Sequence, residues 1–375
     1  MAGIYIHIPF CESRCYYCDF YSSTYKGNKE EYLRMVCKEL SERREYLHGE
    51  TVKTLYLGGG TPSLLDCSDL ALLIDTVRNC FDCDLEEVTM EANPEDLTSD
   101  YLKSIASLPI NRLSIGVQSF DDAELKLINR RHSAERANQC IKDAQNVGFE
   151  NISIDLIYGL PNQTLEKWQT NVHKALSCQV QHISAYSLTF EEHSMLTKMK
   201  EKGLVCEQDE EVSLAMFKLL RRELSNQGIL PYEISNFARP GYESKHNSSY
   251  WNYVPYLGVG PSAHSFDGCS RQWNVANTRE YLRKMACGEV CHEREELDVY
   301  ARYNEYVMTG LRRTVGVSIR DLNRLFGDLL SEYFVENISS FWKEGKVVQT
   351  NDRFSLSEEG IFISDYIIEQ LLWVE

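Results

Sequence analysis

Three cysteines near the start of the chain are close enough in sequence for their thiolates to bind one metal centre. Cys11, Cys15 and Cys18 follow the pattern C-x3-C-x2-C. Soft thiolates select zinc, copper(I) or an iron–sulfur cluster. A structural zinc site takes four ligands, commonly as two separated pairs, and the lone C-x2-C pair at Cys80 and Cys83 is not placed to complete one. Because three cysteines on a 4Fe–4S cluster leave one iron open to another ligand, the spacing favours a cluster, with zinc or a metal-free loop as alternatives.

Composition and charge limit the class of protein. The chain has 375 residues, 43% of them hydrophobic, and a net charge of −17 with a pI of about 5.1. An acidic chain repels phosphate backbones, so nucleic acid is not the expected partner. No apolar run is long enough to span a membrane and no signal-peptide pattern is present. We therefore predict a cytoplasmic protein with reduced thiols, which leaves peripheral docking at a membrane open.

Alternating strands and helices predict the elements that position the cysteines. Each short β-branched run is followed by a loop with Gly or Pro and an amphipathic helix, which is typical of βαβ units in a parallel sheet. The first 228 residues therefore predict six such units, as an open doubly wound sheet or a partial (β/α)6 barrel, and the position of the ligand-binding residue types favours the barrel. The predicted strands are Gly3–Ile8, Thr54–Leu57, Glu87–Glu91, Arg112–Gln118, Asn151–Ile157 and His182–Leu188. The predicted helices are Lys29–Leu47, Ser68–Asn79, Ser99–Ser107, Ala134–Val147, Leu165–Ser177 and Asp209–Asn226.

Ligand-binding residue types gather where the predicted strands end. Gly58–Gly60 follow the second strand, Glu91 and Gln118 end the third and fourth, and Asp155 lies late in the fifth. In parallel α/β folds this edge is where ligands bind. Glycines let the backbone approach a ligand, and Arg130 offers a planar guanidinium to a carboxylate. We expect these residues to form one ligand site beside the cysteines.

The sequence changes character after residue 228. Residues 229–294 predict an extension, and its first part, 229–266, is rich in Gly, Pro, Tyr and Asn with little helical periodicity. Helical patterns return over 295–375, with a hairpin at Val347–Leu356 that turns at Asn351–Asp352. This pattern predicts a smaller, mainly helical, winged-helix-like domain. Because no basic stripe supports DNA binding, we expect it to pack against the barrel as a cap.

Several motifs together resemble known families. The cysteine motif after a first strand resembles the radical S-adenosylmethionine (SAM) superfamily. YIHIPFC, GGGTPS, EANP, GVQS and DLIYGLP, in this order, resemble the oxygen-independent coproporphyrinogen III oxidase family over almost the whole chain. The resemblance implies a barrel like that of triosephosphate isomerase, a 4Fe–4S cluster on the three cysteines and no assigned catalytic acid, base or nucleophile. It also implies SAM contacts at Tyr5, Gly59, Gly60, Thr61, Glu91, Gln118, Arg130 and Asp155.

Two departures move the expectation from oxidase to chaperone. Phe20 stands where the oxidase has a further cysteine, and the oxidase's N-terminal extension does not precede the cysteine motif here. A later H-N-x-x-Y-W motif, His246–Trp251, resembles the haem-chaperone branch of the family. That branch implies haem as a ligand, client apo-haemoproteins as partners and His246 as a candidate haem ligand, with His264 second. The alternatives are a hydrogen-bonded loop role for His246 and a radical enzyme acting on a porphyrinogen.

Overall fold

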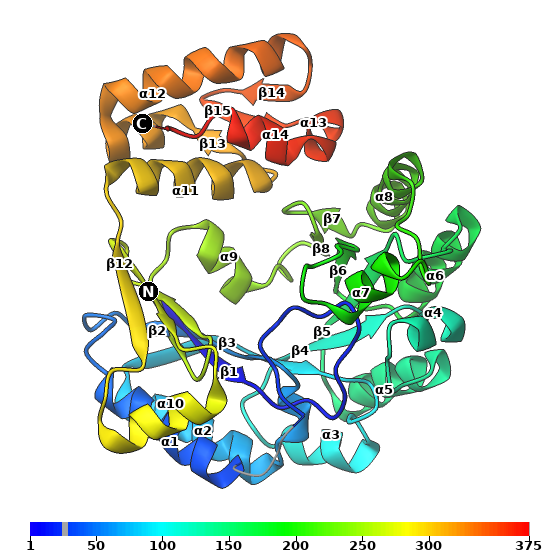
Figure 1. Cartoon of the computed structure of the whole chain (residues 1–375), viewed down its shortest axis with the longest axis vertical. Coiled ribbons are helices and arrows are strands. Elements are labelled where there is room, and N and C mark those ends of the chain that lie inside the picture. Colours follow the sequence, from blue (N-terminus) through cyan, green and yellow to red (C-terminus); the bar gives the residue numbers. More distant parts are fainter. Residues whose placement is uncertain (25–28, 375) are drawn as a thin grey trace.

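Six parallel strands form the centre of a twelve-stranded sheet in the computed structural model, which describes residues 1–24 and 29–374 (Figure 1). Each of these strands overlaps the strand predicted for it. Among the described residues the two edge strands do not pair with each other, so the sheet is open and the predicted partial barrel is confirmed. The six are β1 (Ala2–Ile8), β2 (Val52–Gly59), β3 (Cys83–Ala92), β4 (Arg112–Gln118), β5 (Asn151–Tyr158) and β6 (His182–Ser187).

Amphipathic helices cover the outer face of the parallel strands. In one of them, α5, Ala137, Cys140, Ile141 and Ala144 are buried at helical spacing, and the other helices follow the same rule. No helix among the described residues has the length and apolar character needed to cross a bilayer. The helices are α1 (Lys29–Glu42), α2 (Cys67–Cys80), α3 (Ser99–Ile105), α4 (Asp122–Leu127), α5 (Ala134–Val147), α6 (Leu165–Ser177), α7 (Met195–Glu201) and α8 (Glu210–Asn226), with a 3-10 turn at Pro62–Leu64. The short α4 and α7 were not predicted.

The first helix is shorter than its periodicity predicts. We expected it to run to Leu47, but α1 ends at Glu42 and turns follow. Arg43 bends its guanidinium inward, where it donates to the Glu39 carboxylate at 3.1 Å and to the Gln272 amide oxygen at 2.7 Å. The Glu39 bond is a local i, i+4 contact, whereas the Gln272 bond ties Arg43 to a distant segment. This tertiary contact outweighs local helix propensity, so the prediction beyond Glu42 is wrong.

Residues 229–294 are more regular than the sequence predicts. They hold six strands that extend both edges of the sheet and two helices: β7 (Leu230–Pro231), β8 (Asn236–Ala238), α9 (Lys245–Trp251), β9 (Tyr256–Val259), β10 (His264–Phe266), β11 (Ser270–Asn274), α10 (Thr278–Cys287) and β12 (His292–Glu296). The low helical periodicity of 229–266 did not reveal α9, and the H-N-x-x-Y-W motif lies in this helix rather than in a loop. A seven-residue helix is too short to show a periodicity in sequence.

A buried carboxylate holds α9 against the base of the barrel, the end opposite the cysteines. Glu87, which is almost fully buried on β3, accepts hydrogen bonds from the backbone N–H groups of Lys245 at 2.8 Å and His246 at 3.0 Å. Ser244 caps the same helix end through the N–H of Asn247. An anion at a helix N-terminus satisfies donors that the helix itself leaves free. The contact therefore fixes α9 between the sheet and the C-terminal helices (Figure 1).

The C-terminal part has a hydrophobic core of its own. Its helices are α11 (Val299–Arg312), α12 (Ile319–Lys343), α13 (Glu358–Phe362) and α14 (Ser364–Glu369), and β13 (Val317–Ser318), β14 (Val347–Thr350) and β15 (Arg353–Leu356) form a small sheet. The predicted hairpin is confirmed, because β14 and β15 pair and Asn351 has the positive φ its turn requires. The Tyr253 hydroxyl donates to the Arg302 carbonyl at 2.8 Å and links this part to the segment after α9.

The capping role of Glu87 predicts an asymmetric effect of two neighbouring substitutions. Glu87→Gln removes a buried charge that accepts two backbone donors, so we expect it to destabilise the protein by about 2–4 kcal/mol. The adjacent Glu86→Gln breaks only exposed ion pairs with Lys53 and Lys245 and should destabilise the protein much less. Urea unfolding followed by circular dichroism measures both. Equal effects would contradict the proposed cap.

Candidate functional site

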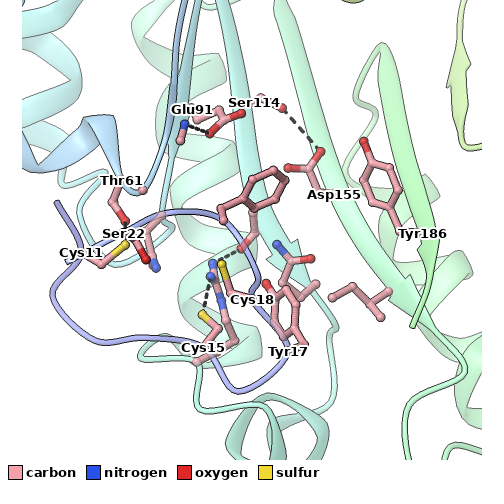
Figure 2. A pocket seen from close by; sticks show the side chains of 18 of the residues that line it. Cys11, Cys15, Tyr17, Cys18, Ser22, Thr61, Glu91, Ser114, Asp155 and Tyr186 are labelled. Carbon is pink, nitrogen blue, oxygen red and sulfur yellow. Dashed lines mark hydrogen bonds between the residues drawn. The ribbon is translucent and has the colours of Figure 1, made fainter. Parts of the chain in front are cut away.

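One cavity collects most of the residues that the sequence singles out. It opens at the carboxyl ends of the parallel strands and has a volume of about 770 Å³, within the range typical of small-molecule sites. Figure 2 shows the cysteine loop along one side, with Glu91 and Asp155 deeper in the cavity. The predicted residues that line it are Cys11, Cys15, Cys18, Gly59, Gly60, Thr61, Glu91, Gln118, Arg130 and Asp155. Their assignments to a cluster and to SAM stay predictions.

Hydrogen bonds to neighbouring elements shape the cysteine loop. The Thr61 hydroxyl donates to the Cys11 sulfur at 3.5 Å, and the Arg130 guanidinium donates to the Cys15 sulfur at 3.3 Å. His7, on β1, contacts the Tyr21 carbonyl through Nε2 at 2.9 Å, and burial lowers the pKa of His7 to about 4. The neutral ring therefore donates to that carbonyl and orders the end of the loop.

The three thiols fit a multi-iron cluster better than a single ion. Burial, followed by the proximity of Cys15 and Cys11, raises the pKa of Cys18 to about 11, although a hydrogen bond to the Phe20 backbone opposes the rise. A bound cation offsets such repulsion between thiolates. Within residues 1–24 and 29–374, no three His, Cys, Asp or Glu side chains converge on a point where one metal ion could bind. A 4Fe–4S cube offers a separate iron to each cysteine, so its ligands need not converge.

The glycine run after β2 brings backbone close to both the loop and an acidic side chain. Gly59 has a φ of +106°, and a Cβ there would lie 2.6 Å from the His7 ring, so both conformation and space require glycine. The Gly59 N–H donates to Glu91 at 3.0 Å, and the Tyr56 hydroxyl donates to the other carboxylate oxygen at 2.8 Å. Burial nevertheless raises the pKa of Glu91 to about 7. Glu91 can therefore hold an ammonium group once ionised.

The fourth and fifth strands supply a polar wall. Gln118 has a φ of +67°, a strained conformation of the kind found at functional sites, and its amide lies over Gly116. The Arg130 guanidinium donates to the Gly116 carbonyl as well as to Cys15. Asp155 accepts from the Ser114 hydroxyl at 3.4 Å, and burial raises its pKa. These groups present donors and acceptors to one ligand.

Three predicted residues lie outside the cavity wall. The Tyr5 hydroxyl bonds to His7 Nδ1 at 3.0 Å, so Tyr5 acts on the cysteine loop through His7. His264 exposes its ring and stacks on Trp273. His246 is only 1% exposed, and its Nδ1 and Nε2 bond to the hydroxyls of Thr54 and Tyr250, each at 2.8 Å.

His246 is therefore a neutral, buried side chain. Burial, then the charge of Arg112, lowers its pKa to about 3. Its ring stacks on that of Tyr56, with centroids 5.1 Å apart. A haem iron could reach either nitrogen only after a hydrogen bond to Thr54 or Tyr250 is broken. The role of His246 as haem ligand stays a prediction.

Sequence reasoning missed the residues at the inner end of the cavity. Arg112 and Asn247 line it, as does Tyr56, which supports Glu91. An arginine at the start of a strand usually reads as exposed. The spacing could have identified Arg112. Arg112, Ser114 and Gln118 are an even number of residues apart on β4, so their side chains face the same side of the sheet.

Comparisons with known proteins agree with the fold and specify the family. Residues 5–175 match the family model described as Radical SAM superfamily, and residues 297–363 match the HemN C-terminal domain. The haem chaperone HemW of Lactococcus lactis is 33% identical over 98% of this chain and 96% of its own length. That of Bacillus subtilis is 34% identical over 99% of each chain. The chain belongs to the HemW family.

A solved relative supports the architecture expected for a HemW family member. The coproporphyrinogen III oxidase HemN of Escherichia coli, a radical SAM enzyme, superposes with a TM-score of 0.85 over 99% of this chain and 90% of that chain. At 22% identity this likeness shows a shared fold. The HemW family and HemN thus have the same radical SAM barrel and C-terminal domain, and the residues in the cavity must distinguish their chemistry.

The raised pKa of Glu91 predicts a pH-dependent gain in stability from Glu91→Gln. The pKa in the folded state, about 7, exceeds the ordinary 4.5, so folding favours the neutral acid. This contribution is complete below pH 4.5 and disappears as the pH rises through 7. The melting temperature of Glu91→Gln relative to wild type should therefore rise between pH 5 and pH 8. Glu95→Gln, an exposed change in the same loop, should show no such trend. If the melting temperatures of Glu91→Gln and wild type changed in parallel with pH, the raised pKa of Glu91 would be contradicted.

Proposed function

We propose that this protein is a haem chaperone that holds a 4Fe–4S cluster, SAM and haem and delivers haem to client apo-haemoproteins. The observation that carries the proposal is the identity of 33–34% to haem chaperones over nearly all of both chains. The likeness includes the C-terminal domain and residues 229–294, so it extends beyond the part that radical SAM proteins share. The identity of the clients is outside the proposal.

The cavity residues divide the work of holding the cluster and SAM. Cys11, Cys15 and Cys18 would bind three irons, and the cluster would supply an electron to SAM. Ionised Glu91 and the backbone at Gly59 would bind the ammonium group. Arg130, already aimed at Cys15, would neutralise a carboxylate beside the open iron. Gln118 and Asp155 face the same space and would accept or donate to ribose hydroxyls.

Phe20 favours the chaperone over the oxidase. It lines the cavity two residues after Cys18, and its ring is 69% exposed. An aromatic side chain on the wall of a cavity offers contact area to an apolar ligand. A thiol at this position, as the oxidase resemblance leads one to expect, would instead offer a redox-active or metal-binding group. Phe20 thus suits a site that holds a macrocycle.

A cytoplasmic location fits the state of the thiols. All thirteen cysteines lie in the described ranges, and each is a free thiol rather than half of a disulfide. Cys80 and Cys83 lie at the amino-terminal end of β3, the opposite end of the sheet from the cluster loop. Free thiols in this number persist in a reducing compartment.

The proposal predicts haem binding without porphyrinogen oxidation. Protein reconstituted anaerobically with iron and sulfide should bind haem, seen as a shift of the Soret band in a titration. The same preparation, reduced and supplied with SAM and coproporphyrinogen III, should form no protoporphyrinogen in multiple turnovers. Catalytic formation of that product would favour the oxidase instead, and no haem binding would refute the chaperone.

The axial haem ligand can be tested by removing the hydrogen-bond partner of His246 as well as by substituting His246 itself. Tyr250→Phe removes the hydroxyl that occupies Nε2, so haem affinity should rise about two- to tenfold if His246 binds the iron. His246→Ala should then lose the ligand's contribution to the Soret position, while His264→Ala should bind haem as wild type does. If Tyr250→Phe has no effect and His264→Ala loses the band shift, His264 is the ligand.

A further inference from the structure

Arg112 is a buried cation at the inner end of the cavity. It is the first residue of β4, and its side chain is 1% exposed and lines the cavity together with Asn247 of α9. Gln118, at the outer edge, is six residues further along the same strand, roughly 20 Å at the usual rise per residue. Arg112 therefore lies far from the cysteine loop, at the base that α9 closes.

The guanidinium of Arg112 lacks partners that buried arginines normally have. Its Nε and Nη1 make no hydrogen bond within the described part of the chain. Arg43 provides the contrast, because it is paired with Glu39 and bonded to Gln272. Arg131, at the cavity mouth, is paired with Asp96 at 2.7 Å. A buried guanidinium with two unpartnered nitrogens destabilises a fold unless a ligand supplies the missing acceptors.

The nearby carboxylates do not complete the coordination of Arg112. Glu91 bonds to Tyr56 and Gly59, and Asp155 bonds to Ser114. Burial raises the pKa of both acids, and their hydrogen bonds go to these other groups rather than to Arg112. The positive charge of Arg112 therefore remains available to an anionic group.

The outer part of the same cavity is apolar on one side. Phe20, Ile157 and Leu188 line it, and Figure 2 shows Tyr186 on the same side as Asp155. A ligand that fits both regions has a broad apolar body and a carboxylate at one end. Haem has this character, since its two propionates extend from one edge of an apolar macrocycle.

We propose that Arg112 binds a propionate carboxylate of haem at the base of the cavity. This inference rests on the proposed function and assigns the site that orients the haem. Nε and Nη1 lie on different edges of the guanidinium, so a carboxylate oxygen would accept from one of them, which gives a charge-assisted contact. The macrocycle would then extend from Arg112 toward the mouth of the cavity, through the space that Glu91, Gln118 and Asp155 also offer to SAM, so haem and SAM would occupy the cavity in turn. Arg112 is thus a specificity residue for a carboxylate-bearing porphyrin.

The test compares haem with its dimethyl ester, which keeps the macrocycle and lacks both charges. Wild type should bind haem at least about tenfold more tightly than the ester. Arg112→Gln should reduce this ratio of affinities to about one, because it weakens the binding of haem and leaves the binding of the ester unchanged. Arg112→Lys should restore part of the ratio, because lysine returns the positive charge without the planar guanidinium. The matched control Arg131→Gln, at a cavity arginine that already has a partner, should keep the wild-type ratio. If Arg112→Gln fails to fold, Arg112→Lys decides by the same ratio.

A second arm separates the propionate from the carboxylate of SAM. Decarboxylated SAM and SAM are compared on the same variants. If Arg112→Gln removes a preference for SAM and leaves the haem ratio unchanged, Arg112 binds SAM and the inference is overturned. Equal affinity of wild type for haem and its ester overturns the inference while the proposed function stands. Failure of wild type to bind haem overturns both.

Discussion

The contact between Glu87 and the start of α9 holds the inner end of the cavity together. The carboxylate fixes the helix, the helix places the His246 ring against Tyr56, and the Tyr56 hydroxyl holds Glu91 beside Gly59. A chain of direct contacts thus runs from the base of the barrel to the glycine run next to the cysteine loop. An open sheet does not close its own interior, so a separate helix must do this. The residues of α9 therefore influence the cluster end of the cavity without touching it.

The buried ionisable groups of the cavity lower the stability of the fold, but they can bind charged ligands. Glu91 and Asp155 are less stable ionised than they would be in water, and Arg112 has nitrogens without partners. A core of similar volume built from apolar side chains would be the more stable solution. Such groups suit a binding site, because a ligand that pairs with them supplies the favourable interactions that they do not make in the protein alone. The shared direction of these shifts supports a site that is completed by charged ligands.

The residues that the sequence could predict are those whose position follows from strand order. Cys11 follows β1, Gly59 and Glu91 lie at the ends of β2 and β3, and Asp155 lies late in β5. Such ends meet at one edge of a parallel sheet, so the gathering of these residues in one cavity was predictable. The position of His246 was not, because a seven-residue helix gives no periodic signal and its burial depends on Glu87, 159 residues away. The early end of α1 likewise depends on Arg43 meeting Gln272. Each of these two predictions failed because the local structure depends on a contact between segments that are distant in sequence.

The shared fold with HemN does not by itself distinguish the two functions, so their difference lies beyond the backbone. The backbone that carries the cysteine loop, the glycine run and the strand ends is common to a protein that oxidises a porphyrinogen and to chaperones named for haem. An oxidase must expose a reactive position of its substrate to a radical, whereas a carrier must hold its cargo by groups that can release it. Phe20 at the mouth and Arg112 at the base provide an apolar contact and an ionic one at opposite ends of the cavity. Such contacts bind an amphipathic molecule without forming a covalent bond, and a competing partner can replace them one at a time.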